Sequence, residues 1–223
     1  MSAVRALLFD LDGTLIHSMP LHHESWRLWH AQQGLPFDED GFFAATAGRS
    51  NAEILADLFP QHDALQRAAM AEAKEALYRE LAATQLTLVP GAHELLAAAA
   101  AHGVACAICT AAPPGNIELA LTRFALGERV QAITSPADGL RGKPHPDIFL
   151  AAAARLGVEC AHCLVLEDAP LGVEAARRAG MRAFALTTTL PAEAFAAFPN
   201  LIGVAHDLAA FDLEPLLRDP THA

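Results

Sequence analysis

Short apolar runs alternate with helical stripes along most of the chain. The apolar run at residues 6–9 stops at Asp10, and its length is typical of a buried parallel strand. From residue 89 onward, each helical stripe precedes another apolar run. The predicted helix and strand pairs are 92–101 with 104–109, 117–124 with 130–134, 147–156 with 163–166, and 172–179 with 183–186. This alternation predicts a parallel sheet wrapped by helices.

The segment between residues 20 and 83 has a different pattern. Apolar residues such as Leu21, Trp26 and Trp29 recur there at helical spacing, and no run has the character of a strand. Gly34 is a typical helix end. We therefore expect an α/β protein with a Rossmann-like parallel-sheet core, built from residues 1–16 and 87–223. A small all-helical cap, residues 17–86, is inserted after the first strand.

Charge and hydropathy limit the partners of this 223-residue chain. Its 15 Lys and Arg against 26 Asp and Glu give a net charge of −11, which argues against a nucleic-acid binder. The apolar run before Asp10 is too short for a signal peptide, and Gly103 divides the apolar stretch at 95–112 into a helix and a strand. We expect a cytoplasmic monomer with no membrane or nucleic-acid partner.

Four cysteines form two C-x-x-C pairs, Cys106 with Cys109 and Cys160 with Cys163. This spacing is a zinc-site pattern. However, the first pair lies inside a predicted strand, where residues three apart point to opposite faces, so its two thiolates could not close on one zinc ion. Free cysteine is often buried, and we interpret all four as buried structural cysteines.

Polar residues follow the predicted strands in a regular order. Ligands of open parallel sheets bind at the carboxyl ends of the strands, so these residues should share one rim. The first strand leads to Asp10 and Asp12, the second to Thr110, the third to a loop with Lys143, and the fourth to Glu167 and Asp168. Four acids, a hydroxyl and a lysine would therefore lie together.

The rim has the components of phosphoryl transfer. Two carboxylates at positions i and i+2 can divide nucleophilic attack and proton transfer between them. Clustered carboxylate oxygens suit Mg²⁺ together with phosphate oxygens. The Thr110 hydroxyl, the backbone amides of Thr110 and Ala111, and the Lys143 ammonium can hold a phosphate. The joint pattern predicts transfer of a phosphoryl group to an aspartate.

Four motifs resemble those of the haloacid dehalogenase superfamily, close to its β-phosphoglucomutase-like phosphatases. They are FDLDGTL from Phe9, ICTAA from Ile108, GKPHPDIF from Gly142 and VLEDAPLGVEAARRAG from Val165. The resemblance covers nearly the whole chain. It implies that Asp10 is the nucleophile that forms an aspartyl-phosphate. It also implies that Asp12 protonates the leaving oxygen and then activates water.

The resemblance also implies a Mg²⁺ cofactor and roles for the other rim residues. Asp10, Asp168 and the backbone carbonyl of Asp12 would ligate Mg²⁺, with Glu167 helping directly or through water. Thr110 would bind the transferring phosphoryl group, and Lys143 would balance charge. The presence of Asp12 and of the Glu167–Asp168 pair speaks against the dehalogenase branch, which dispenses with the metal.

Two positions near the second motif concern substrate contact. Ala111 stands where many members carry Asn, so its backbone N–H would make the phosphate contact instead. Asn116 matches a position that can contact substrate in the family. An alternative is that Asn116 caps the helix that begins before Ile117.

In this family, specificity resides in the cap. His22 matches a cap histidine of β-phosphoglucomutases, although it could equally be a partly exposed helix residue. A mutase would carry Lys at Ala47 and Arg at Asn51, and the loss of both counts against mutase activity. Arg49 remains as a candidate for binding a phosphate or carboxylate, with a surface salt bridge as the alternative.

Three functions compete on this basis. A Mg²⁺-dependent phosphatase acting on a small phosphorylated metabolite, such as a sugar phosphate or a phosphoglycolate-like acid, agrees best with the motifs. A sugar-phosphate mutase is disfavoured by the cap substitutions. A non-catalytic phosphate-binding module is disfavoured because no core residue is missing.

Overall fold

The chain folds into two compact units. The computed structural model describes residues 2–46 and 50–218. One unit comprises Met1–His17 and Thr87–Ala223, and the other comprises Ser18–Leu86. Among the described residues, no helix has the length and apolar character needed to cross a bilayer.

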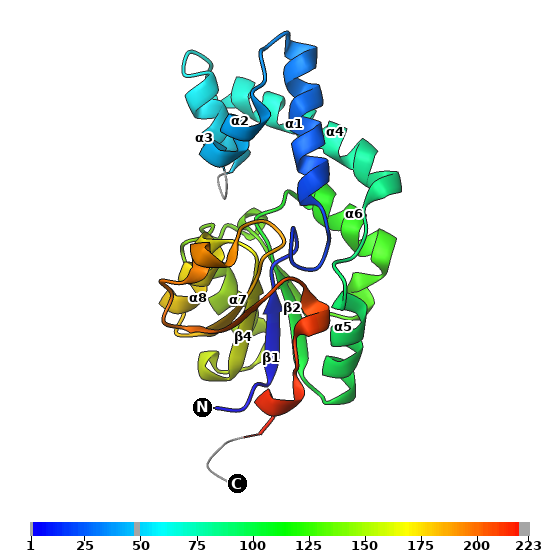
Figure 1. Cartoon of the computed structure of the whole chain (residues 1–223), viewed down its shortest axis with the longest axis vertical. Coiled ribbons are helices and arrows are strands. Elements are labelled where there is room, and N and C mark those ends of the chain that lie inside the picture. The colour runs from blue at the N-terminus through cyan, green and yellow to red at the C-terminus, as the bar shows by residue number, and fades with distance from the viewer. Residues whose placement is uncertain (1, 47–49, 219–223) are drawn as a thin grey trace. The chain divides into compact units, whose positions relative to one another are not determined.

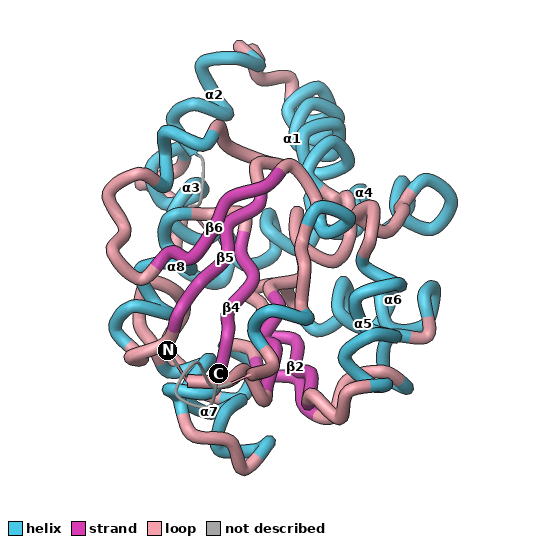
Figure 2. The backbone as a smooth tube through the Cα atoms, turned by 60° about the horizontal axis from the view of Figure 1, so that its bottom comes forward, coloured by secondary structure: helices cyan, strands magenta, loops and turns pink. Residues whose placement is uncertain are grey.

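The larger unit is built on a six-stranded parallel sheet. The strand order is β3-β2-β1-β4-β5-β6, and Figure 2 shows β4, β5 and β6 side by side. The strands are β1 (Ala6–Phe9), β2 (Ala105–Cys109), β3 (Ala132–Thr134), β4 (Cys163–Glu167), β5 (Arg182–Leu186) and β6 (Leu201–Ala205). This sheet confirms the predicted Rossmann-like fold class.

Helices cover both faces of the sheet (Figure 1). α5 (Ala92–Ala101) and α6 (Pro114–Phe124) lie on one side, and α7 (Asp147–Leu156) and α8 (Pro170–Arg178) lie on the other. Ile148 and Phe149 of α7 and Val173 of α8 are fully buried against the sheet. Each such side chain contributes about 1.5–3 kcal/mol of transfer free energy.

Within its described residues, the smaller unit consists of helices and the loops that connect them. Its helices are α1 (Met19–Gln33), α2 (Glu39–Thr46), α3 (Asn51–Leu58) and α4 (Ala64–Gln85). Gly34 ends α1 in the left-handed conformation, as the sequence predicts. Ser50 and Asp63 form capping boxes at the starts of α3 and α4.

Aromatic residues form the core of the helical unit. Trp26 and Trp29 pack edge to face with ring centroids 5.6 Å apart, and Ile54 and Leu55 are buried beside them. Trp29 is 1% exposed. The unit therefore has a hydrophobic core of its own.

The two connections between the units run together. Ile16 and Leu88 form an antiparallel bridge. His17 N–H donates to the Thr87 carbonyl at 2.8 Å, and Val89 N–H donates to the Leu15 carbonyl at 3.0 Å. The chain thus leaves the sheet unit and returns to it along one short paired ribbon.

Strand β6 was not predicted. It is a half-exposed edge strand, and its pairing with β5 shifts register between Ala183 and Phe184. Gly203 lies beneath the Phe184 ring, where a Cβ would come within 2.6 Å of a ring carbon. A short edge strand that contains a glycine shows little alternation of apolar and polar residues, so the sequence pattern does not indicate a strand.

The first cysteine pair is divided between the two faces of the sheet. Cys109 belongs to the cluster that contains Leu8, whereas Cys106 pairs in register with Leu7 on the other face. Burial raises the pKa of Cys106, Cys109 and Cys163 to about 12. These three are buried cysteines as predicted, while Cys160 is only partly buried.

Candidate active site

Lys143 joins the ends of two neighbouring strands. Asp10 follows β1, Glu167 ends β4, and Lys143 lies on the loop between β3 and α7. The Lys143 ammonium forms ion pairs with Asp10 Oδ1 and Glu167 Oε1. None of the three side chains is more than 10% exposed. Three of the predicted rim residues therefore meet in a buried cluster.

The Glu167 carboxylate is fixed by the backbone N–H groups of the two residues that follow it. Its Oε2 accepts the N–H of Asp168 at 3.1 Å and the N–H of Ala169 at 3.0 Å. Gly172 of α8 packs directly on the carboxylate, where any Cβ would overlap Oε1. Glu167 thus holds Lys143 from a fixed position, and direct metal ligation by it stays a prediction.

Asp168 lies against the loop that follows β1. It is 4% exposed, and the Thr189 hydroxyl donates to its Oδ2. Gly13 has φ +76°, and a Cβ there would overlap the same carboxylate oxygen. Thr189 was not predicted as a site residue, because it follows β5 in no recognisable motif.

Burial and crowding shift the ionisation of this cluster. Burial raises the pKa of Asp10 well above its ordinary value, Lys143 opposes this, and Glu167 and Asp168 add to it. Burial, followed by the charge of Glu167, raises the pKa of Asp168 to about 7. Burial alone would lower the pKa of Lys143, but the Asp10 and Glu167 carboxylates outweigh it and raise that pKa.

The acids have the chemistry of a hard-cation site. All their donors are oxygens. Burial and then mutual repulsion raise the pKa of Asp10 and Asp168, and a divalent cation would relieve the repulsion. Within residues 2–46 and 50–218, no three His, Cys, Asp or Glu side chains form a group that could hold a metal. The predicted set consists of the Asp10 and Asp168 carboxylates and the Asp12 carbonyl, with Glu167 helping directly or through water, and it stays a prediction.

The second strand contributes Thr110. It is 1% exposed, and its hydroxyl oxygen accepts the Ala112 N–H at 3.0 Å. The neighbouring Ala111 is exposed. Asn116 is buried in the first turn of α6, whose N-cap is Pro113. The helix-cap interpretation of Asn116 is therefore wrong, and a substrate contact there stays a prediction.

Asp12 lies in the tight turn between Asp10 and the rest of the loop. Gly13 N–H donates to the Ile16 carbonyl at 2.8 Å, and Asp12 and Ile16 form an isolated bridge. The Asp12 residue is partly exposed. Asp10 is buried and Asp12 is more open, and this difference suits a nucleophile and a proton-transfer group.

A second polar cluster lies in the helical unit. Lys74 of α4 is 1% exposed, and its ammonium lies 2.9 Å from Glu75 Oε1 and 2.8 Å from His22 Nδ1. The Asn51 amide donates to Glu75 Oε1 at 2.5 Å. The His22 ring stacks on Tyr78 with centroids 3.9 Å apart. We call these five residues the cap cluster.

The contact with Lys74 involves one nitrogen of the His22 ring. A lysine ammonium donates and cannot accept, so His22 Nδ1 is the acceptor in this contact. The other cap predictions, Ala47 and Arg49, lie outside the described residues. Of the predicted cap residues, the structure thus places His22 in a polar network.

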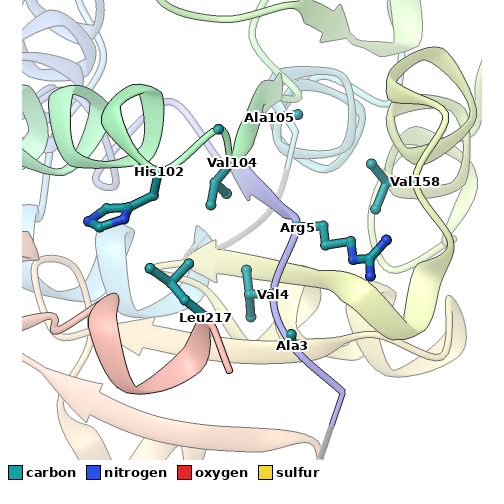
Figure 3. Close-up of a pocket in the computed structure, with 9 residues that line it drawn as sticks. Ala3, Val4, Arg5, His102, Val104, Ala105, Val158 and Leu217 are labelled. Carbon is teal, nitrogen blue, oxygen red and sulfur yellow. The ribbon is translucent and has the colours of Figure 1, made fainter. Parts of the chain in front are cut away.

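A hollow of about 530 Å³ lies at the opposite end of the sheet (Figure 3). Val104 and Val158 line it together with two exposed polar side chains, Arg5 and His102. It opens at the amino ends of β1 and β2, whereas the acids follow the carboxyl ends. Because no acid of the cluster lines it, this hollow is not the candidate active site.

Known proteins with similar sequences include a phosphatase and a mutase. The haloacid dehalogenase-like hydrolase family matches residues 4–180. Validoxylamine A 7′-phosphate phosphatase of Streptomyces hygroscopicus subsp. limoneus is 36% identical over 86% of this chain and 90% of its own length. Beta-phosphoglucomutase of Bacillus subtilis is 33% identical over 80% of this chain and 81% of its own.

One solved structure matches over nearly the whole fold. The HAD hydrolase, family IA, variant 3, from Entamoeba histolytica superposes with a TM-score of 0.88 at 28% identity. The match covers 96% of this chain and 98% of that one. The similarity therefore includes both units and is not confined to the sheet.

Proposed function

This chain belongs to the haloacid dehalogenase-like hydrolases and is a phosphoric monoester hydrolase, and from that premise we propose that it is a Mg²⁺-dependent phosphatase for small phosphate esters. One observation carries the proposal. The buried Asp10 carboxylate is ion-paired with Lys143, which Glu167 holds from the other side. This arrangement provides a fixed nucleophile and a charge-balancing cation at the carboxyl ends of two parallel strands.

In the first step, an Asp10 oxygen attacks the phosphorus of the ester. The bond between phosphorus and the leaving oxygen breaks, and Asp12 gives that oxygen a proton. Lys143 and the Thr110 hydroxyl hold the phosphoryl oxygens as charge develops on them. The products are the free alcohol and an aspartyl-phosphate on Asp10.

In the second step, Asp12 takes a proton from water. The water oxygen attacks the phosphorus, and the bond to Asp10 breaks and releases inorganic phosphate. Asp10, Asp168 and the Asp12 carbonyl are the groups we assign to Mg²⁺. When bound, the ion would neutralise phosphate charge and favour the ionised forms of these acids.

We assign recognition of the rest of the substrate to the cap cluster. Lys74 and Glu75 balance each other's charge, and Asn51 and His22 add polar groups that suit hydroxyls. A phosphate ester with a hydroxylated remainder, such as a sugar phosphate, is therefore favoured. A phosphoglycolate-like acid would instead depend on Arg49 to bind its second anionic group.

The mutase remains the second candidate because of one relative's activity, that of the beta-phosphoglucomutase. A bisphosphate intermediate needs cations in the cap. Asn51, where a mutase would carry Arg, donates to the acidic Glu75, and this contact disfavours a second phosphate.

Incubation of the purified protein with a panel of phosphorylated metabolites and Mg²⁺ tests the proposal. We expect inorganic phosphate and the free alcohol, with Asp10→Asn inactive on every substrate. An isomeric hexose phosphate without free phosphate would establish the mutase instead. Loss of activity in Arg49→Ala on the best substrate alone, by about tenfold to a hundredfold, would indicate an acidic remainder.

A further inference from the structure

Three consecutive threonines follow β5, and each hydroxyl donates to a different part of the sheet unit. The Thr187 hydroxyl lies 3.4 Å from the Ala205 carbonyl at the end of β6. The Thr188 hydroxyl lies 2.5 Å from the Gly13 carbonyl. The Thr189 hydroxyl donates to Asp168 Oδ2. Only the third of these acceptors is a carboxylate of the candidate active site.

Thr189, Gly13 and Asp168 pack against one another. A Cβ on Gly13 would overlap Asp168 Oδ2 and would lie 2.8 Å from Thr189 Oγ1. The three residues follow β5, β1 and β4, and β4 lies between the other two strands in the sheet. The Asp168 carboxylate therefore lies against Gly13 and accepts a hydrogen bond from the Thr189 hydroxyl.

We propose that Thr189 is a positioning residue for divalent cation binding, acting through Asp168. The inference rests on the proposed function, because it takes Asp168 as a ligand of Mg²⁺. The Thr189 hydroxyl donates to one oxygen of Asp168 and so restricts rotation of the Asp168 side chain. Less conformational entropy of Asp168 is then lost when Mg²⁺ binds. Groups that hydrogen-bond a metal-ligating carboxylate commonly change metal affinity by about tenfold to a hundredfold when they are removed.

The neighbouring threonines supply matched controls. Thr189→Val keeps the shape of the side chain and removes the donor, while Thr189→Ser keeps the donor and removes a methyl group. Thr187→Val makes the same chemical change two residues earlier, where the hydroxyl meets only a backbone carbonyl. A comparison of these variants separates the contact with Asp168 from a general loosening of the loop.

The test is calorimetric titration of Mg²⁺ into the metal-free, full-length protein without substrate. We expect Thr189→Val to bind Mg²⁺ about tenfold to a hundredfold more weakly than the wild type. Thr189→Ser and Thr187→Val should bind it as the wild type does. In phosphate-release assays, the activity of Thr189→Val should recover as Mg²⁺ is raised, because the loss is one of affinity.

Two results would overturn the inference. The first is wild-type Mg²⁺ affinity in Thr189→Val, with or without a lower melting temperature of the metal-free variant, which would assign the hydroxyl to the loop alone. The second is a wild-type protein that neither binds Mg²⁺ nor needs it, which would overturn the proposed metal dependence as well, whereas the first result leaves that dependence intact. If Thr189→Val does not fold, Thr189→Ala takes its place under the same criteria.

Discussion

Each unit of the molecule buries a lysine among polar groups, and the two surroundings differ in charge. Lys143 pairs with Asp10 and Glu167, and two more acids, Asp12 and Asp168, act on the same cluster. Lys74 pairs with Glu75, and its ammonium also contacts the His22 ring. A further cation would relieve the excess negative charge of the first cluster. The Lys74–Glu75 pair and its amide and imidazole neighbours suit hydrogen bonds to uncharged groups.

The largest expected effect is a loss of turnover on substitution in the acidic cluster, with little loss on substitution in the cap cluster. Asp10→Asn removes the proposed nucleophile, so kcat should fall by about 10⁴-fold or more on every substrate. In the cap cluster, Glu75→Gln should leave turnover of a small aryl phosphate nearly unchanged, because we assign Glu75 no part in phosphoryl transfer.

The measurement is phosphate release under single-turnover conditions. Asp212→Asn, an exposed carboxylate outside both clusters, is the control and should behave as the wild type. Turnover by Asp10→Asn at more than about a hundredth of the wild-type rate would place the nucleophile elsewhere.

Removal of the metal should abolish the catalytic activity that we assign to the acidic cluster and should not change the cap cluster. A chelator should reduce activity to background, and added Mg²⁺ should restore it and raise the melting temperature. Metal binding requires ionised carboxylates, and burial raises the pKa of Asp168 to about 7. Asp168 is protonated below that pH, so the Mg²⁺-induced rise in melting temperature should be smaller at pH 5.5 than at pH 8. Equal rises at both pH values would contradict the assignment of Asp168.

Removing each lysine sharpens the comparison. Lys143→Met should lower kcat by about 10²–10³ on all substrates, as for loss of a group that stabilises developing charge. Lys74→Met leaves Glu75 buried without its cation, so the free energy of unfolding should fall by about 3–5 kcal/mol.

Kinetics on two substrates and urea denaturation give both quantities. Lys74→Met should raise KM for the best metabolite and spare a small aryl phosphate. The double variant Lys74→Met with Glu75→Gln should recover most of the lost stability, since no buried charge then remains unpaired. If it recovers none, the loss came from the cation–π contact of Lys74 with Trp26 and not from an unpaired Glu75.

The smallest effect concerns the cysteines. Thiolate is the reactive form, and burial raises the pKa of Cys106, Cys109 and Cys163 to about 12. Iodoacetamide at pH 8 should therefore modify Cys160 first, with little loss of activity. Mass spectrometry of peptides from the native protein measures this order, and early labelling of Cys109 would contradict it.

The same contrast explains what could be predicted from the sequence. Asp10, Glu167 and Lys143 follow strands or lie in motifs, so their meeting follows from parallel topology alone. His22 and Lys74 are 52 positions apart on two helices, and only the packing of α1 on α4 brings them together. Thr189 shows no sequence pattern because its contact is with Asp168, which follows the neighbouring strand β4.

The fold follows the same rule. The helices predicted at residues 92–101 and 147–156 have those bounds in the structure, because their apolar stripes repeat over several turns. Strand β6 escaped prediction because an edge strand is half exposed and Gly203 interrupts its pattern. Asn116 was open between two interpretations because helix α6 begins at Pro114, ahead of the apolar stripe that marked it.

The paired ribbon formed by Ile16 and Leu88 has an evolutionary consequence. Both ends of the inserted helical segment meet at one point of the sheet unit. An insertion with adjoining ends replaces a turn, and its length changes the closure entropy only slowly. Lineages can therefore exchange or remodel this segment without moving any strand of the sheet. Such an arrangement would let the helical segment change while the residues that follow β1 and β4 keep their places in the sheet unit.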